Sequence, residues 1–320
     1  MRSVSRVLLY RTLGLGDFLT AVPAYRAVRR ALPRYEVLLA APEPLRPLAA
    51  LTDAVDTFLA TPELAVPPWP GQPPQLAVNL HGRGPQSHAA ISALAPARLV
   101  TFGRQELGIA GPVWRPDEHE VSRWCRLLEQ SGIPADPGDL HLARPGRVSP
   151  RPGATVVHPG AAATARRWPA DRFATLAARL RAAGHDVVVT GLGSERELAE
   201  AVARTGGLPE ASVLAGRLDL GGLAALVSAA RLVVCGDTGV AHLATAYRTP
   251  SVILFGPTPP ARWGPPHHGR HRVIWHGDRV GGRAPGDGAH PALLAVTVEE
   301  VLAEVARLSD GPSVRPLPAR

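Results

Sequence analysis

Short runs of Val, Ile, Leu and Ala alternate with longer segments of helical spacing along the chain. In the second half they predict strands at 154–157, 186–190, 232–235 and 251–255, and helices at 170–183, 194–204, 221–230, 238–247 and 297–308. Strands this apolar are buried on both faces, which indicates a parallel sheet covered by helices.

The first half shows the same pattern less regularly. We expect strands at 5–10, 37–40, 76–80 and 99–102, a helix from a glycine turn to about residue 31, and another at 118–130. Segment 143–153 is rich in Pro, Gly and Arg, which is typical of a linker. We therefore predict an α/β protein with two Rossmann-like domains, 1–148 and 149–309, and a disordered tail at 310–320.

The net charge of +8 raises the question of a nucleic-acid partner. All 35 basic residues are Arg, and their excess is spread, with 16 Arg against 13 acids in 1–150 and 19 against 14 in 151–320. Because no basic tail or block of like charge concentrates this excess, we predict no nucleic-acid partner.

Cysteine usage and hydropathy suggest a location. Two cysteines are too few for a disulfide framework and fit a reducing compartment. The first apolar run ends at Arg11, too early for a signal peptide, and no run approaches the ~18 apolar residues of a membrane span. We expect a cytoplasmic monomer with at most peripheral membrane contact.

The clearest candidate site lies where the strand at 232–235 gives way to a helix. Asp237, Thr238 and Gly239 form the junction, and His242 follows on the helix. Free backbone N–H groups and the positive end of the helix dipole at such a junction bind phosphate. The alternative is that Asp237 or Thr238 only caps the helix and that His242 packs inside.

A second loop, 157–169, also leaves a strand and enters a helix. Gly160 and its small neighbours allow close backbone approach, Thr164 follows, and Arg166 and Arg167 offer guanidinium forks suited to a diphosphate. Two such loops in one domain predict a diphosphate site more strongly than either loop does alone. The alternative is that both arginines are solvated and that Trp168 anchors the helix start.

The turn at 14–17 is the third candidate. It fails as a dinucleotide fingerprint, because Leu19 occupies the place of the last glycine. Asp17 could take a proton from an acceptor hydroxyl, although the helix dipole should keep its pKa low. It could instead be a first-turn acid that stabilises the helix.

Weaker candidates complete the set. Gly191 follows a strand and could line a nucleotide pocket, or could belong to an ordinary turn. His81, Arg83 and Ser87 could contact an acceptor, or could form a polar loop. The chain contains no Asp-x-Asp pair, so we predict no metal and stabilisation of the leaving group by arginine and helix dipoles.

Taken in order, these motifs resemble glycosyltransferase family 9, the heptosyltransferase-like group, over nearly the whole length. The four signatures are GDxxxxxP at 16–23, HPGA with RRWP at 158–169, GDTGxxH at 236–242 and LFGPT at 254–258. Four ordered signatures are far more specific than any one of them.

The resemblance implies a GT-B fold, with two Rossmann-like domains whose parallel sheets face each other across a cleft. It implies inverting transfer from a nucleoside-diphosphate sugar, the only co-substrate, to a hydroxyl of a surface-glycan or lipid-linked acceptor. Asp17 would be the general base, with Gly16 beside it on the acceptor side. The diphosphate would lie against Thr164, Arg166, His242 and the backbone near 238–239.

Two positions depart from the family pattern. Arg166 stands where Lys is usual, and Gly221 stands where heptosyltransferases commonly have an acid near the nucleotide's sugar. The donor base and its sugar therefore stay open. Two other functions also stay open, a GT-B-like sugar-nucleotide epimerase and a non-catalytic nucleotide-sugar-binding protein.

Overall fold

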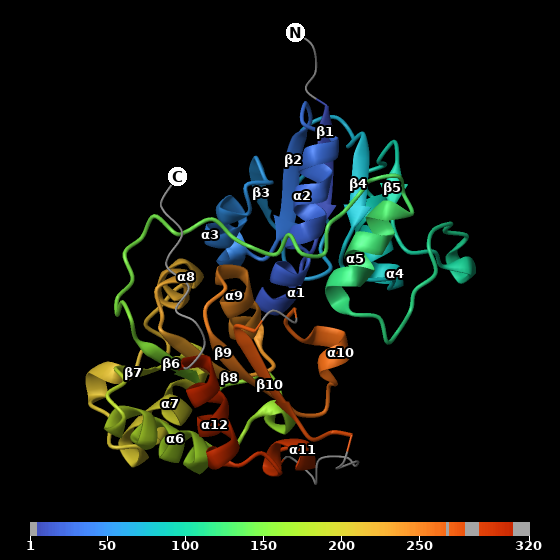
Figure 1. The fold of residues 1–320 in the computed structure, drawn as a ribbon. Helices are drawn as coiled ribbons and strands as arrows, with labels where there is room; N and C mark the ends of the chain where they lie inside the picture. Colours follow the sequence, from blue (N-terminus) through green and yellow to red (C-terminus); the bar gives the residue numbers. More distant parts are fainter. Residues whose placement is uncertain (1–4, 267–268, 279–287, 310–320) are drawn as a thin grey trace.

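The computed structural model describes residues 5–266, 269–278 and 288–309, and the tail predicted at 310–320 lies outside them. It consists of two α/β lobes (Figure 1). The first contains β1 (Arg6–Tyr10), α1 (Leu15–Thr20), α2 (Val22–Ala31), β2 (Glu36–Ala41), α3 (Arg46–Ala49), β3 (Thr57–Ala60), β4 (Leu76–Asn79), α4 (Pro85–Ser92), β5 (Leu99–Val100) and α5 (Glu120–Glu129). The second contains β6 (Thr155–His158), α6 (Ala170–Ala182), β7 (Val187–Val189), α7 (Arg196–Thr205), α8 (Leu220–Ser228), β8 (Leu232–Gly236), α9 (Gly239–Tyr247), β9 (Ser251–Phe255), α10 (Pro260–Trp263), β10 (His271–Trp275), α11 (Pro291–Leu294) and α12 (Val298–Ser309).

Each lobe is built on a five-stranded sheet. The strand orders are β3-β2-β1-β4-β5 and β10-β9-β8-β6-β7, and every pair is parallel. The strand order reverses between β1 and β4 in the first sheet and between β6 and β8 in the second. Ligands of open α/β sheets bind at such switch points, beyond the carboxyl ends of the strands.

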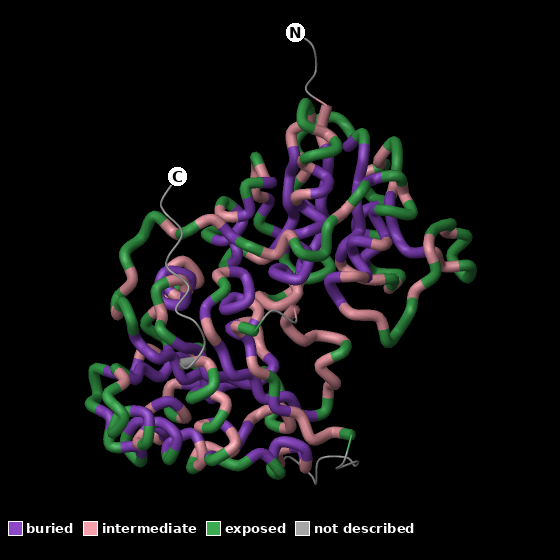
Figure 2. Tube along the Cα trace, viewed as in Figure 1, coloured by how far each residue is buried: buried purple, intermediate pink, exposed green. Residues whose placement is uncertain are grey.

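The strands are apolar because helices cover both faces of each sheet. In the second lobe, Val157 and Val234 belong to a core shared with α6, α7 and α12. Their neighbours Val156 and Val233 point the other way, into a core shared with α8 and α9. Figure 2 shows the result, with buried strands inside each lobe and exposed loops outside.

The two lobes meet through helices α1 and α9. Phe18 of α1 and Val240 and Ala241 of α9 belong to one continuous cluster of buried apolar residues. Figure 1 shows these two helices side by side at the centre of the molecule. The carboxyl edges of both sheets therefore face one gap.

The structure divides the first predicted helix in two. Helix α1 ends at Thr20, Ala21 caps it, and α2 begins at Val22. Pro23 has no N–H group to bond back into α1, so the helix cannot continue with regular hydrogen bonding. The break lets α1 point toward the second lobe while α2 packs along the first sheet.

Two strands were not predicted, β3 and β10, and each lies at the edge of its sheet. An edge strand is covered less completely and so carries polar residues, such as Arg272 in β10. The predicted boundary at 148/149 falls between α5 and β6, a stretch fully described and without helix or strand. The exact boundary stays a prediction.

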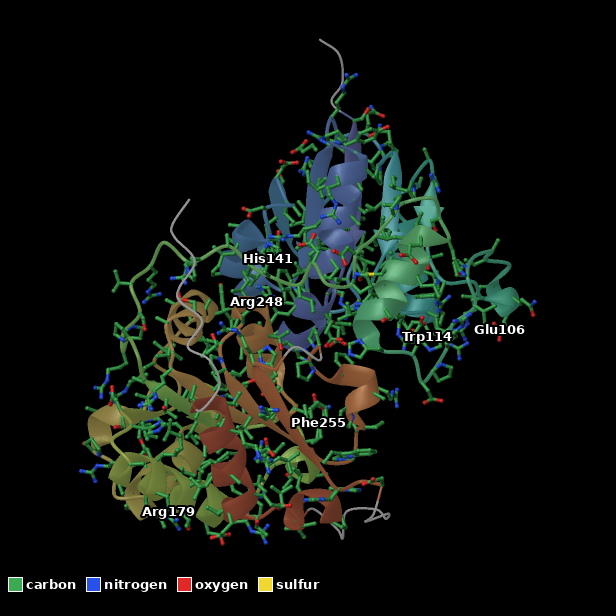
Figure 3. The ribbon with its side chains drawn as sticks, in the orientation of Figure 1. Glu106, Trp114, His141, Arg179, Arg248 and Phe255 are labelled. Carbon is green, nitrogen blue, oxygen red and sulfur yellow. The ribbon has the colours of Figure 1, made fainter. Side chains whose placement is uncertain are left out.

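Charged side chains surround both lobes. Figure 3 shows this, with Arg179 on the outer side of α6 and Glu106 on an outlying loop of the first lobe. None of the helices in the described ranges combines the length and apolarity that crossing a membrane requires.

Candidate functional site

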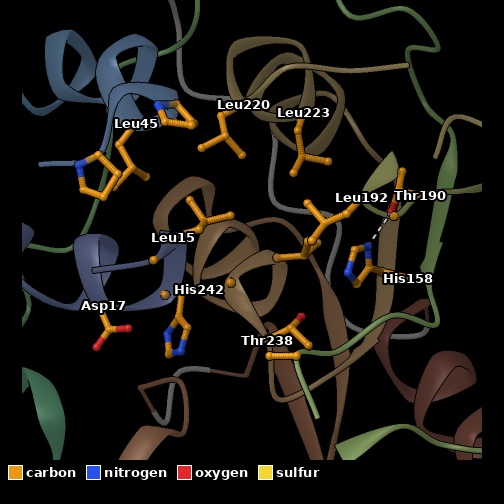
Figure 4. Close-up of a pocket in the computed structure, with 18 of the residues that line it drawn as sticks. Leu15, Asp17, Leu45, His158, Thr190, Leu192, Leu220, Leu223, Thr238 and His242 are labelled. Carbon is orange, nitrogen blue, oxygen red and sulfur yellow. Dashed lines mark hydrogen bonds between the residues drawn. The ribbon is translucent and has the colours of Figure 1, made fainter. Parts of the chain in front are cut away.

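A cleft of about 1040 Å³ separates the lobes at the carboxyl edges of both sheets. Its walls come from loops of both lobes: 12–17 after β1, 42–47 after β2, 158–166 after β6, 190–195 after β7, 214–223 at the start of α8 and 237–242 after β8. Figure 4 shows that its ends differ. Asp17 and His242 lie toward one end, and Leu45, Leu220 and Leu223 lie at the other.

The loops after β6 and β8 converge in the second lobe. The Arg166 guanidinium donates to the carboxylate of Asp237 and, at 3.4 Å, to the hydroxyl of Thr258. Asp237 is almost fully buried, whereas the Arg166 side chain is one-third (33%) exposed at the cleft wall. Burial raises the pKa of Asp237, and the neighbouring Arg166 opposes this shift. The carboxylate therefore orients a guanidinium that still faces the cleft.

Helix α9 begins at the same wall. Its N-cap residue Thr238 has an extended backbone and makes no capping bond through its side chain. The N–H groups of the first turn lack the usual partner four residues back, although that of Ala241 bonds to the carbonyl of Thr238, and the helix dipole adds partial positive charge there. With Arg166 beside it, this helix start presents positive charge to the cleft, an arrangement that suits an anion such as a diphosphate.

His242 lies one turn into α9 and faces the first lobe. A Cβ placed on Gly16 would be 3.1 Å from its imidazole, and its ring packs edge-on against Trp263 with centroids 5.8 Å apart. Burial lowers the pKa of His242 to about 4, with His119 and Arg166 adding to the shift. The imidazole is therefore neutral at pH 7 and can donate or accept a hydrogen bond.

Asp17 lies in the first turn of α1, beside His242 (Figure 4). Its carboxylate accepts a hydrogen bond of 3.2 Å from the buried guanidinium of Arg11 and is 32% exposed toward the cleft. We expected the helix dipole to keep its pKa low, and this was wrong. Burial raises the pKa of Asp17, and Arg11 offsets only part of that shift. A raised pKa makes the carboxylate a stronger base.

Comparison with known proteins agrees with this geometry. The family model described as glycosyltransferase family 9 (heptosyltransferase) matches residues 112–280, more than half of the chain. The chain belongs to glycosyltransferase family 9.

One curated relative of this family 9 protein is lipopolysaccharide heptosyltransferase 1 of Pseudomonas aeruginosa. It is 36% identical over 162 residues, which cover 49% of this chain and 44% of the relative. The match thus spans less than half the length of the relative.

Solved structures match over almost the whole chain. E. coli ADP-heptose LPS heptosyltransferase II has a TM-score of 0.76 and 22% identity, covering 95% of this chain and 98% of that one. E. coli heptosyltransferase WaaC with ADP has a TM-score of 0.70 and 19% identity, covering 95% and 99%. These similarities confirm the GT-B fold of the family 9 chain.

Eight of the predicted site residues lie together on the wall of the family 9 cleft. They are Gly16, Asp17, Arg166, Gly191, Asp237, Thr238, Gly239 and His242. Because Gly16 has no side chain, the His242 ring can pack directly against its backbone. Gly16 therefore allows the two lobes to pack closely.

Three predicted diphosphate contacts lie outside that wall. Thr164 is exposed at the start of a short 3-10 helix, and Arg167 donates two hydrogen bonds to the carbonyl of Ala161. Gly160 serves a different purpose, since a Cβ there would lie 2.3 Å from the carboxylate of Glu195. The structure thus assigns Gly160 and Arg167 to shaping the loop.

The predicted acceptor contacts also differ in position. The His81 ring lies 3.0 Å from the hydroxyl of Thr12, which lines the cleft. Arg83 is exposed, with its carbonyl bonded to Arg104. Ser87 is buried and bonds to Asn79, so its hydroxyl acts within the first lobe.

Sequence reasoning missed Arg11 and Glu120, which surround Asp17. Arg11 directly follows a buried strand, and a charged residue at that position was the available signal. Glu120 gave no signal, because α5 lies more than 100 residues away along the chain. It also missed Trp263, which packs on His242 from the end of α10.

Within the described ranges, no group of three or more His, Cys, Asp or Glu side chains is arranged to hold a metal ion. Metal independence stays a prediction, and among the described residues the arginines that line the cleft are Arg46 and Arg166.

Proposed function

We propose that this chain transfers a sugar from a nucleoside-diphosphate donor to a hydroxyl of a surface-glycan or lipid-linked acceptor, with inversion at the anomeric carbon. One observation carries the proposal. The Asp17 carboxylate, whose pKa is raised, and the positively polarised start of α9 come from opposite lobes and line the same cleft. Family 9 membership and the heptosyltransferase relatives support it.

Asp17 starts the reaction in this proposal. Its carboxylate takes the proton of the acceptor hydroxyl as the oxygen forms a bond to the anomeric carbon, and the bond from that carbon to the diphosphate oxygen breaks. A single displacement of this kind inverts the anomeric centre. Burial favours this proton transfer, because it raises the pKa of Asp17 toward neutral pH.

Arg166 and the first turn of α9 stabilise the leaving diphosphate. Negative charge accumulates on the bridging oxygen as the bond to the sugar breaks, and fixed donors at that place lower the barrier. Asp237 keeps the guanidinium in position, and the neutral His242 offers one more hydrogen bond between base and diphosphate. These groups supply what a bound cation supplies in other transferases.

The relatives suggest where to begin with substrates. One solved relative is named an ADP-heptose LPS heptosyltransferase, and another carries ADP-2-deoxy-2-fluoro heptose. In this chain the expected acid is absent at Gly221, where a Cβ would lie 3.3 Å from Pro47 of the first lobe. We propose a heptosyl or hexosyl donor and place ADP-heptose first in a panel of nucleoside-diphosphate sugars.

The decisive experiment compares the wild-type protein with D17N. The panel is first ranked by thermal shift, and turnover of the best donor is then followed with and without glycan acceptors. We expect an acceptor-dependent inverted product from the wild type, and loss of turnover with retained donor binding in D17N. An epimer formed without acceptor would show the epimerase, and binding with no product would show a non-catalytic protein.

We also propose that the protein works in the cytoplasm as a monomer, with at most peripheral membrane contact. Its two cysteines are both buried and unpaired, which fits a reducing compartment. Light scattering in solution tests the oligomeric state, and flotation with anionic vesicles tests membrane contact.

A further inference from the structure

Arg11 occupies an unusual position for an arginine. Its side chain has no solvent exposure, and its guanidinium stacks 4.6 Å from the ring centroid of Trp124. It donates to the carbonyls of Leu80 and Asp17, the latter at 2.7 Å. A buried cation is costly unless it is paired, so its partners decide what it does.

Two carboxylates share this cation. A single nitrogen of Arg11, Nη2, lies 3.2 Å from Oδ1 of Asp17 and 3.1 Å from Oε1 of Glu120. Glu120 is itself held, because its oxygens accept hydrogen bonds from Trp124 at 2.9 Å and Arg123 at 3.1 Å. The side chain of Asp17 reaches the cleft, whereas Glu120 is buried behind it.

We propose that Glu120 and Arg11 are positioning residues that set the basicity and direction of Asp17. This inference rests on the function proposed above. Arg11 holds the carboxylate toward the cleft, and Glu120 is the second counter-ion of Arg11, which it shares with Arg123. Neither needs to touch the substrate.

The charges explain why two acids are needed. When Asp17 takes the acceptor's proton it becomes neutral, and Arg11 loses one of its two counter-ions. Glu120 then remains between Arg11 and Arg123, so the Arg11 guanidinium keeps one carboxylate partner. Without Glu120, protonation of Asp17 would leave two buried cations, Arg11 and Arg123, without a carboxylate partner, so the Asp17 carboxylate would hold its negative charge more firmly.

Other charged and titratable groups around Asp17 come from both lobes. Arg166 acts from the second lobe and lowers its pKa, as Arg11 does, whereas Glu120 raises it. His242, whose ring lies against the neighbouring residue Gly16 across the lobe contact, is neutral at pH 7. The buried Tyr25 on α2 interacts with both Arg11 and Asp17. Glu120 is therefore the acidic neighbour whose removal changes the charge balance around Asp17.

The experiment measures the titration of Asp17 directly. Carboxyl carbons of aspartate are followed by NMR against pH in the whole protein, with D17N identifying the resonance. We expect E120Q to lower the pKa of Asp17. We expect R11M to raise it, because the two carboxylates then lose the guanidinium that they share.

E118Q is the matched control. Glu118 lies just before α5 and makes an ion pair of 2.6 Å with Arg126, whose side chain is as well covered as its own (12% exposed each). It makes no contact with Asp17 or Arg11. We expect E118Q to leave the Asp17 titration unchanged.

Turnover provides the second measurement. For E120Q we expect kcat/KM to fall roughly ten- to a hundredfold, with the acidic limb of its pH profile moved to lower pH and donor affinity retained. A purely structural role would lower activity equally at all pH values. Asp17 titrations that coincide in the wild type, E120Q and E118Q would overturn the inference. If the titrations differ but no sugar is transferred, the charge coupling stands and the proposed transferase function fails.

Discussion

Replacing Gly239 with Ala should separate the two lobes at the point where base and diphosphate site meet. A Cβ at position 239 would lie 2.8 Å from both Cβ and Cγ of Leu15 on α1. Ordinary contacts of this kind are 3.4–4 Å, so α1 and α9 must move apart by roughly 1 Å. The Cβ of Leu15 is rigidly attached to the backbone, so a rotamer change cannot absorb the shift.

A displacement of this size is large for catalysis. Asp17 lies two residues after Leu15, and it would move relative to the first turn of α9. A misplacement of about 1 Å between reacting groups can cost ~100-fold in rate. We expect G239A to lose about that factor in kcat/KM, while nucleoside-diphosphate binding weakens much less because Arg166 and the α9 N–H groups stay in one lobe.

Steady-state kinetics with donor and acceptor, together with calorimetric titration of the nucleoside diphosphate, measures both effects. G14A is the control, since nothing lies within 4 Å of a Cβ there and the backbone is extended. The variant should still fold, because Ala is favoured over Gly in a helix by about 1 kcal/mol. Equal kcat/KM values for G239A and G14A would refute the reasoning.

Three further predictions concern charge and pH. R166M should weaken nucleoside-diphosphate binding by roughly tenfold and R167M by much less, since Arg167 is occupied by Ala161; equal losses in titration calorimetry would contradict the assignment. Burial lowers the pKa of His81, His158 and His242 from 6.5 to about 4. The unfolded chain therefore binds more protons, and stability from this source is complete above about pH 6.5 and is lost as the pH falls toward 4. Thermal unfolding between pH 7.5 and 5 should show a falling Tm, and a constant Tm would speak against neutral buried imidazoles. Turnover should persist in EDTA, because arginine and helix dipoles replace a cation; loss on chelation and recovery with a divalent metal would disprove this.

The sequence by itself determined the fold class and predicted eight residues that the structure brings together in the candidate site. Strands buried on both faces must be almost purely apolar, so their runs predict the parallel sheets from sequence alone. Loops at the carboxyl ends of such strands must carry small or capping residues, and this identified Asp17, Arg166 and the segment around Thr238. The edge strands β3 and β10 were not predicted, because their partial exposure allows polar residues that interrupt the apolar pattern.

Only the tertiary structure decided which of these residues act together. The closeness of Gly16 to His242 and the sharing of Arg11 by Asp17 and Glu120 join segments more than 100 residues apart, and no local pattern encodes such contacts. The pKa of Asp17 is another example. Local sequence predicted a low pKa, whereas burial in the folded chain raises it, because desolvation depends on what covers a group. Local sequence sets the backbone and its caps, whereas burial and charge pairing belong to the assembled chain.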